Sequence, residues 1–94
     1  MKQIIDRKVY DTETATLIAS NRFWDGSNFE RSGRNTYLYK TTKGSFFSYH
    51  TTQWQGERDS IEALTVDEAK SLYEDLPEHE ADYESAFGEK PEEA

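Results

Sequence analysis

The chain has 94 residues, with 19 Asp and Glu against 11 Lys and Arg, and its formal net charge is −8 at pH 7. This length fits one small domain, and two Trp, six Tyr and five Phe compensate for few aliphatic core formers, so we expect a fold with an aromatic-rich core. Because cysteine is absent and the apolar runs are short, the sequence excludes disulfides and thiolate sites and predicts neither a membrane span nor a secretory signal.

Short strand-like runs separated by turn residues occupy residues 1–64, which we expect to be mainly β-structure. Lys2–Ile5 and Lys8–Tyr10 flank Asp6-Arg7 and predict a small hairpin. After a brief turn, a further strand is expected from Thr16 to Ala19 or beyond.

The clearest hairpin signal lies in the middle of the chain. Thr36–Thr41 and Ser45–Thr51 alternate polar and apolar residues around a turn at Thr42-Lys43-Gly44. By this alternation Tyr37 and Tyr39 share one face of the sheet, and Leu38 and Lys40 share the other. A last strand is expected at Ser60–Leu64, directly before the helical part of the chain.

A helix is predicted to begin at a capping box, in which Thr65 and Glu68 satisfy each other's backbone amides. The residues that follow place one apolar face along this helix, namely Val66, Ala69, Leu72, Tyr73 and Leu76. Pro77 is expected to end the helix near Leu76.

A second short helix is expected over Glu78–Phe87, with Gly88 as its C-terminal stop. The predicted fold is therefore a single α+β domain over residues 1–88, mainly β in 1–64 and helical in 65–88. It consists of a small antiparallel sheet of three to five strands packed by one or two C-terminal helices. Residues 89–94 are expected to form a flexible acidic tail.

The charge is divided unevenly along the chain. Residues 1–58 contain nine Lys and Arg against six Asp and Glu, whereas residues 59–94 contain two Lys and thirteen Asp and Glu. The acidity therefore falls on the predicted helices and the strand that leads into them. Such an asymmetry indicates an electrostatic interaction surface or an acidic tail.

Carboxylates fixed at one-turn spacing on helices form a row of anions comparable to the phosphates of DNA. Such a row can occupy a groove lined by Lys and Arg. Uncompensated like charges cost stability, and this cost favours a functional reason for their presence. The expected partner-binding residues are these acids together with two exposed aromatic anchors: Asp59, Glu62, Asp67, Glu74, Asp75, Glu78, Asp82, Glu84, Trp24 and Trp54.

Two other interpretations stay open. The mildly basic first two thirds carry six aromatic residues that could stack single-stranded bases on a sheet face, namely Tyr37, Tyr39, Phe46, Phe47, Tyr49 and Trp54. Alternatively, these aromatics are core residues and the acidic helix face of an accessory protein confers only solubility.

Enzymatic and metal chemistry have little support in the sequence. His50 and His79 lie far apart without a second histidine at helical spacing, and no EF-hand loop, nucleophile elbow or phosphate-binding loop is present. We therefore expect a non-enzymatic protein without a metal or cofactor.

Three blocks of the chain resemble a family of small proteins of bacteria and mobile elements: Lys8 to Ala15 with its Tyr-Asp-Thr-Glu-Thr-Ala motif, Tyr39 to Phe47, and Leu64 to Ala69. The size, acidity and mixed helix–sheet composition also resemble, more loosely, anti-CRISPR proteins of phages and plasmids. This resemblance implies an inhibitor in the cytoplasm of a host bacterium. Its partner would be a CRISPR-Cas effector subunit with a basic nucleic-acid-binding groove. The inhibitor itself would bind neither nucleic acid nor a membrane. The oligomeric state is left open.

Overall fold

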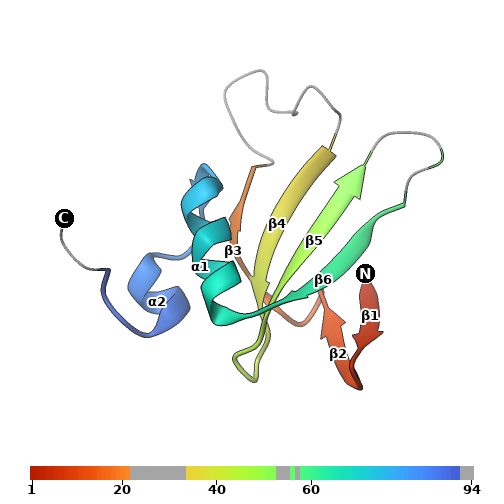
Figure 1. The fold of residues 1–94 in the computed structure, drawn as a ribbon, viewed down its shortest axis with the longest axis horizontal. Helices are drawn as coiled ribbons and strands as arrows, with labels where there is room; N and C mark the ends of the chain where they lie inside the picture. The colour runs from red at the N-terminus through yellow and green to blue at the C-terminus, as the bar shows by residue number, and fades with distance from the viewer. Residues whose placement is uncertain (22–33, 53–55, 57, 92–94) are drawn as a thin grey trace.

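The fold is described from a computed structural model, which defines residues 1–21, 34–52, 56 and 58–91. Its elements are β1 (Lys2–Ile5), β2 (Lys8–Asp11), β3 (Thr16–Ser20), β4 (Arg34–Lys40), β5 (Phe46–Thr52), β6 (Ser60–Leu64), α1 (Val66–Asp75), β7 (Glu78–His79) and α2 (Tyr83–Phe87). Antiparallel strands form a five-stranded sheet in the order β6-β5-β4-β3-β7, and β1 pairs with β2 in a separate hairpin (Figure 1). The predicted α+β class is confirmed.

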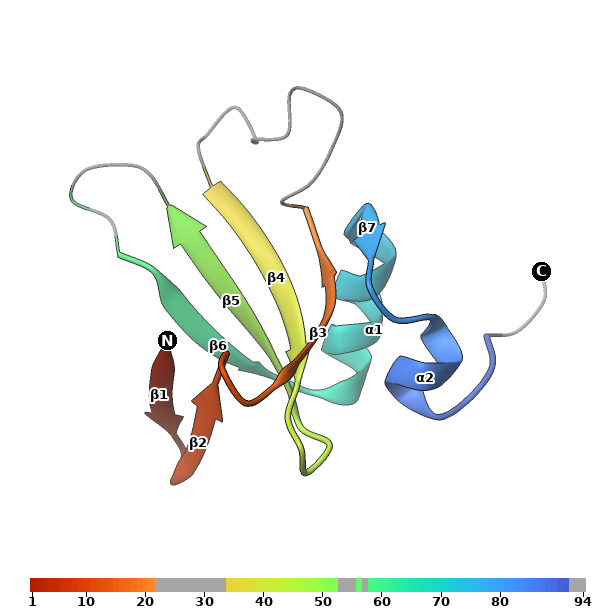
Figure 2. The ribbon, with the colours of Figure 1, turned by 180° about the vertical axis from the view of Figure 1, so that it is seen from behind.

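The two faces of the five-stranded sheet carry different covers. Helices α1 and α2 lie on one face, where they pack against Ile18, Leu38 and Phe46. The β1–β2 hairpin packs against the other face, where Tyr10 lies edge-on to Phe47 at 5.5 Å between ring centroids. Figure 2 shows the hairpin and the β4–β5 turn at the same end of the molecule.

The central hairpin forms around the predicted turn and on the predicted faces, with its second strand beginning at Phe46. Tyr37 lies opposite Tyr49 and Tyr39 opposite Phe47, whereas Leu38 lies opposite Ser48 on the helix side. Phe46 and Phe47 alternate, so each is buried in a different core. Both are therefore core residues, and only the tyrosines of this aromatic group stay half-exposed among the described residues.

Helix α1 begins and ends where its local chemistry predicts. Thr65 Oγ1 accepts a hydrogen bond from the Glu68 amide at 3.1 Å, and Glu68 Oε1 accepts one from the Thr65 amide at 2.8 Å. The helix ends at Asp75, because Leu76 turns into an extended conformation before Pro77. Ala69, Tyr73 and Leu76 are buried against the sheet, but Val66, which was expected on this apolar face, is 51% exposed.

The prediction of a second helix over Glu78–Phe87 is wrong in its first half. Glu78 and His79 instead form strand β7 against Ser20 and Ala19 of β3. The amides of Glu80 and Ala81 continue this contact by donating to the Ile18 carbonyl. The edge of β3 has free backbone N–H and C=O groups, which an extended segment at residues 78–79 can pair with. A helix that began at residue 78 would leave these groups unpaired. Helix α2 begins only at Tyr83, and it ends at Gly88 as predicted, with φ of 76°.

No helix in the described part of the chain is long and apolar enough to cross a membrane.

Candidate functional site

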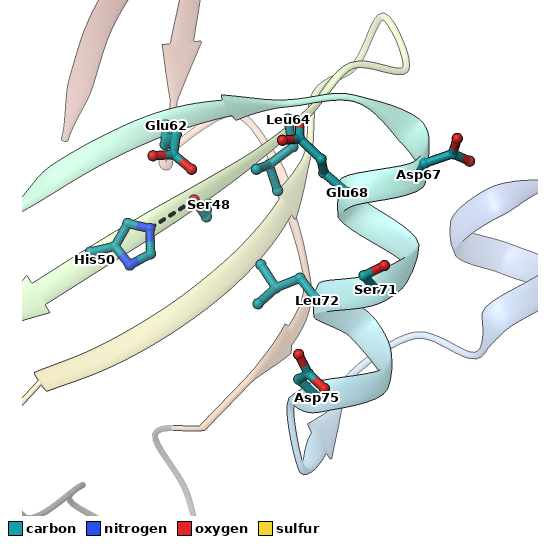
Figure 3. A pocket seen from close by; sticks show the side chains of 9 residues that line it. All are labelled: Ser48, His50, Glu62, Leu64, Asp67, Glu68, Ser71, Leu72 and Asp75. Atoms are coloured by element: carbon teal, nitrogen blue, oxygen red, sulfur yellow. Dashed lines mark hydrogen bonds between the residues drawn. The ribbon is translucent and has the colours of Figure 1, made fainter.

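An open groove of about 460 Å³ runs between α1 and the β5–β6 side of the sheet. Helix α1 contacts the sheet through its buried residues Ala69 and Tyr73. Strands β5 and β6 extend past the helix, so the groove lies between them and its exposed side (Figure 1). Figure 3 shows side chains from the two strands on one wall and side chains of α1 on the other. The lining residues are Ser48, His50, Glu62, Leu64, Asp67, Glu68, Ser71, Leu72 and Asp75.

Four carboxylates line this groove. Glu62 projects from the middle of β6, where the register places it directly opposite Ser48. Asp67 and Asp75 are separated by eight residues on α1, so together with Ser71 they follow one side of the helix at one-turn spacing. Glu68 is the fourth, and all four acids are exposed. We call Glu62, Asp67, Glu68 and Asp75 the acidic groove set.

The lysine of α1 pairs mainly with Glu89 and offsets only part of this set, because the hydrogen bond with Glu89 and, more weakly, the charge of Asp67 raise the pKa of Lys70. Lys70 forms an ion pair with Glu89, and its ammonium lies 6.0 Å from the centre of the Phe87 ring. Because this lysine is held toward the C-terminal segment, the groove is lined by four acids without a Lys or Arg among its described residues.

The strand wall of the groove contains a Ser–His pair. Ser48 Oγ lies 2.8 Å from His50 Nε2, and Thr36 Oγ1 lies 3.4 Å from His50 Nδ1. A hydroxyl beside an imidazole is also the arrangement of some nucleophiles. Ser48, however, is only 1% exposed, so its hydroxyl is poorly placed to reach a bound substrate and serves to orient the histidine.

The predicted acids do not all gather here. Asp59 serves the β5–β6 connection, where its carboxylate accepts hydrogen bonds from the Thr52 amide at 3.1 Å and from the Tyr49 hydroxyl at 3.2 Å. Burial, and then the charge of Asp59, raises the pKa of Tyr49. Glu78 lies in β7 opposite Ser20.

Three further predicted acids lie outside the groove lining, and two predicted aromatics outside the described residues. Asp82 is the N-cap of α2, with its carboxylate 2.7 Å from the Ser85 amide. Glu74 on α1 and Glu84 on α2 are exposed. Trp24 and Trp54 lie outside the described residues.

Sequence reasoning missed six residues of the groove: Ser48, His50, Leu64, Glu68, Ser71 and Leu72. Glu68 was interpreted only as a cap, although a capping carboxylate at the third helical position stays at the surface. Strand alternation, combined with the β5–β6 register, predicts that the side chains of Ser48 and His50 lie on the same sheet face as Glu62. Among the described residues, no group of three or more His, Asp or Glu is placed to hold a metal ion.

The capping role of Asp82 makes helix α2 sensitive to acid. The hydrogen bonds from Ser85 lower the pKa of Asp82 below its ordinary value of 3.8, so the cap stabilises the folded state above that pH. As the pH falls through the lower folded value, the carboxylate is protonated and this contribution is lost. We expect the amide shift of Ser85, followed by NMR, to titrate with a midpoint below 3.8.

Asp82→Asn keeps an oxygen acceptor but does not titrate, so the Ser85 amide should lose this step. The control Glu84→Gln removes one negative charge two residues later, and in this variant the Ser85 amide should still show the titration step. A midpoint at or above the ordinary Asp value in the wild-type protein would contradict the capping role.

Comparison with known proteins adds no further assignment, since no family and no curated or structurally solved protein matches the chain.

Proposed function

We propose that this protein binds another protein through the acidic groove set and occupies that partner's basic nucleic-acid-binding groove. The observation that carries the proposal is the gathering of Glu62, Asp67, Glu68 and Asp75 around one groove whose lining has no Lys or Arg among its described residues, while Lys70 forms its ion pair with Glu89. The resemblance to anti-CRISPR proteins suggests a CRISPR-Cas effector as the partner, in the cytoplasm of a host bacterium. The protein would then be a non-enzymatic inhibitor from a phage or mobile element.

The groove presents several fixed negative charges, as the DNA backbone does. Duplex DNA carries about one negative charge per 1.7 Å of its axis. Asp67 and Asp75 are eight residues apart on α1, which is about 12 Å along the axis at the rise of about 1.5 Å per residue of an α-helix. Together with Glu68 and with Glu62 across the groove, they present an anionic surface to Lys and Arg side chains that normally hold phosphates.

The groove also suits the apolar part of a basic side chain. Leu64 and Leu72 line it between the acids. The methylene stem of a lysine or arginine can cover these leucines while its charged end reaches a carboxylate. Long-range attraction would speed the encounter and make it depend on salt.

We expect the double variant Glu62→Lys/Asp75→Lys to weaken partner binding by about a hundredfold or more, because each reversal replaces an attraction by a repulsion. Both side chains are exposed and neither forms a cap, so folding should be preserved. The assay measures how well the protein displaces labelled target DNA from purified, guide-loaded CRISPR effectors, at low and high salt.

The matched control is Glu13→Lys/Glu80→Lys, which changes the net charge equally at two exposed acids outside the groove lining. It should inhibit nearly as well as the wild-type protein. Inhibition that survives the groove reversal, or that does not weaken with salt, would contradict the acidic groove set as the binding surface. If no effector loses its DNA, the assignment to CRISPR effectors is wrong.

A second candidate function uses the opposite face of the sheet. Tyr37 and Tyr49 are half-exposed and stack on each other at 5.6 Å between ring centroids, which leaves aromatic surface for a single-stranded base. Asp59 beside Tyr49 places a negative charge where a phosphate backbone would approach. A gel-shift assay with short DNA and RNA distinguishes the two functions, because a protein that imitates DNA should bind neither.

A further inference from the structure

A second concave site lies at the end of the molecule where the β1–β2 hairpin approaches the β4–β5 turn (Figure 2). This cleft has a volume of about 610 Å³. The hairpin packs on the sheet face opposite α1, so the cleft is separate from the acidic groove. A volume of this order suits a small organic ligand rather than a single inorganic ion.

The charge of the cleft is opposite to that of the whole protein. Arg7 and Lys8 of the hairpin and Lys43 of the β4–β5 turn line it, against one carboxylate, Asp11. The Asp11 carboxylate already accepts a hydrogen bond from the Glu13 amide at 3.0 Å. Within the described part of the chain, none of the three cations forms an ion pair. The chain has a net charge of −8, yet these three cations line one cleft and pair with no carboxylate of the described residues.

The backbone at Arg7 supports a role for its side chain. Asp6 and Arg7 both have positive φ, at 53° and 68°, as a two-residue hairpin turn of this type requires. Asp is tolerated in this region and glycine is favoured there, whereas an arginine is uncommon. The turn therefore carries a guanidinium at a position where the backbone alone would favour glycine.

Both walls of the cleft are fixed by internal contacts. The hairpin is anchored by Tyr10, which is 6% exposed and packs on Phe47. The β4–β5 turn is closed by hydrogen bonds from the Thr41 amide to the Ser45 carbonyl at 2.7 Å and from the Ser45 amide to Thr41 Oγ1 at 3.0 Å. The hydroxyls of Thr42 and Ser45 add hydrogen-bond donors to the lining.

We propose that this cleft binds a small ligand bearing two or more phosphates, such as a nucleoside polyphosphate. A guanidinium, two ammonium groups and hydroxyl donors around one cleft are the groups that hold phosphate oxygens in proteins. The volume leaves space for more than the phosphates alone. This inference does not depend on the proposed function, because the two sites share no lining residue.

The test is isothermal titration of the full chain with ATP, inorganic pyrophosphate and adenosine at low and physiological salt. We expect ATP and pyrophosphate to bind and adenosine to bind at least about tenfold more weakly, since the phosphates carry the charge-assisted hydrogen bonds. The variant Arg7→Gly/Lys43→Gln should lose at least about tenfold in affinity for ATP.

Arg7→Gly also separates binding from folding. Because glycine favours positive φ, the single variant should melt at the same temperature as the wild-type protein or higher, while its affinity for ATP falls. The matched control Lys2→Gln/Lys90→Gln removes the same charge from exposed positions outside the cleft and should bind ATP within about twofold of wild type, as expected for screened surface charges.

Equal ATP affinity of Arg7→Gly/Lys43→Gln and this control would overturn the site. Adenosine binding as tightly as ATP, or no ATP binding at millimolar concentration, would overturn it as well. If a single-stranded hexanucleotide binds at least about tenfold tighter than ATP, the assignment to a small ligand is wrong, because several backbone phosphates would then be engaged.

Discussion

Phe47→Ala is expected to lower the free energy of unfolding by about 3–5 kcal/mol. Phe47 is fully buried, stacks with Tyr39 at 5.2 Å and meets Tyr10 edge-on at 5.5 Å, both between ring centroids. Together with Ile61, it therefore forms the core through which the β1–β2 hairpin is attached to the sheet. A domain of this size has about 5–15 kcal/mol in total, so the variant should lose a large fraction of its stability.

Urea denaturation followed by tryptophan fluorescence and circular dichroism measures this loss. The melting temperature should fall by at least about 12 °C, given the usual entropy of unfolding for a domain of this length. Phe47→Leu is the matched control, because it keeps most of the buried volume and should cost less than half as much. A loss below about 1 kcal/mol for Phe47→Ala would show that the hairpin and sheet do not share a core, since a truncation this large normally costs several times more.

Tyr73→Ala is expected to have the second-largest effect, about 3–5 kcal/mol, and to act on the C-terminal part of the fold. Tyr73 is 7% exposed and lies 3.9 Å from His79, measured between ring centroids. Tyr83 and Phe87 of α2 meet the same ring edge-on at 5.7 and 5.6 Å. The Tyr73 hydroxyl donates to the Ala81 carbonyl at 2.9 Å. One side chain of α1 thus holds β7, α2 and the link between them.

Hydrogen exchange tests where this loss occurs. In Tyr73→Ala, the amides of Glu80, Ala86 and Gly88, which are hydrogen-bonded in the folded chain, should exchange faster than those in the centre of β4 and β5. Tyr73→Phe keeps the ring and removes only the hydroxyl, so it should cost about 1 kcal/mol. Uniform loss of protection along the whole chain would contradict a local role for Tyr73.

Much of the fold followed from local patterns. The Thr65–Glu68 capping box, Pro77 and the alternation around Gly44 each act within a few residues, so their outcome does not depend on distant parts of the chain. The start of the second helix could not be predicted in this way. Its position depends on the free edge of β3, about sixty residues earlier, which pairs with Glu78 and His79.

The candidate site was less predictable than the fold. Helical spacing indicates which acids can share one side of α1, but of the two neighbouring acids Glu74 and Asp75 only Asp75 lines the groove with Asp67. It does not show that Asp59 closes a strand connection, because that role depends on hydrogen bonds to residues of β5. The cap at Asp82 is a local contact with Ser85, but it was missed because the helix start depends on the pairing of β7 with β3. Nor does composition reveal that Lys70 is occupied by Glu89.

The position of Glu62 also bears on how the protein avoids aggregation. Strand β6 is the outer strand of the sheet, and Glu62 is its central residue. Two molecules meeting edge to edge in antiparallel fashion about this residue would bring the two Glu62 carboxylates directly opposite each other, which is unfavourable. A basic strand would meet no such repulsion. The charge that lines the groove therefore also makes this edge a poor template for another copy of the same chain.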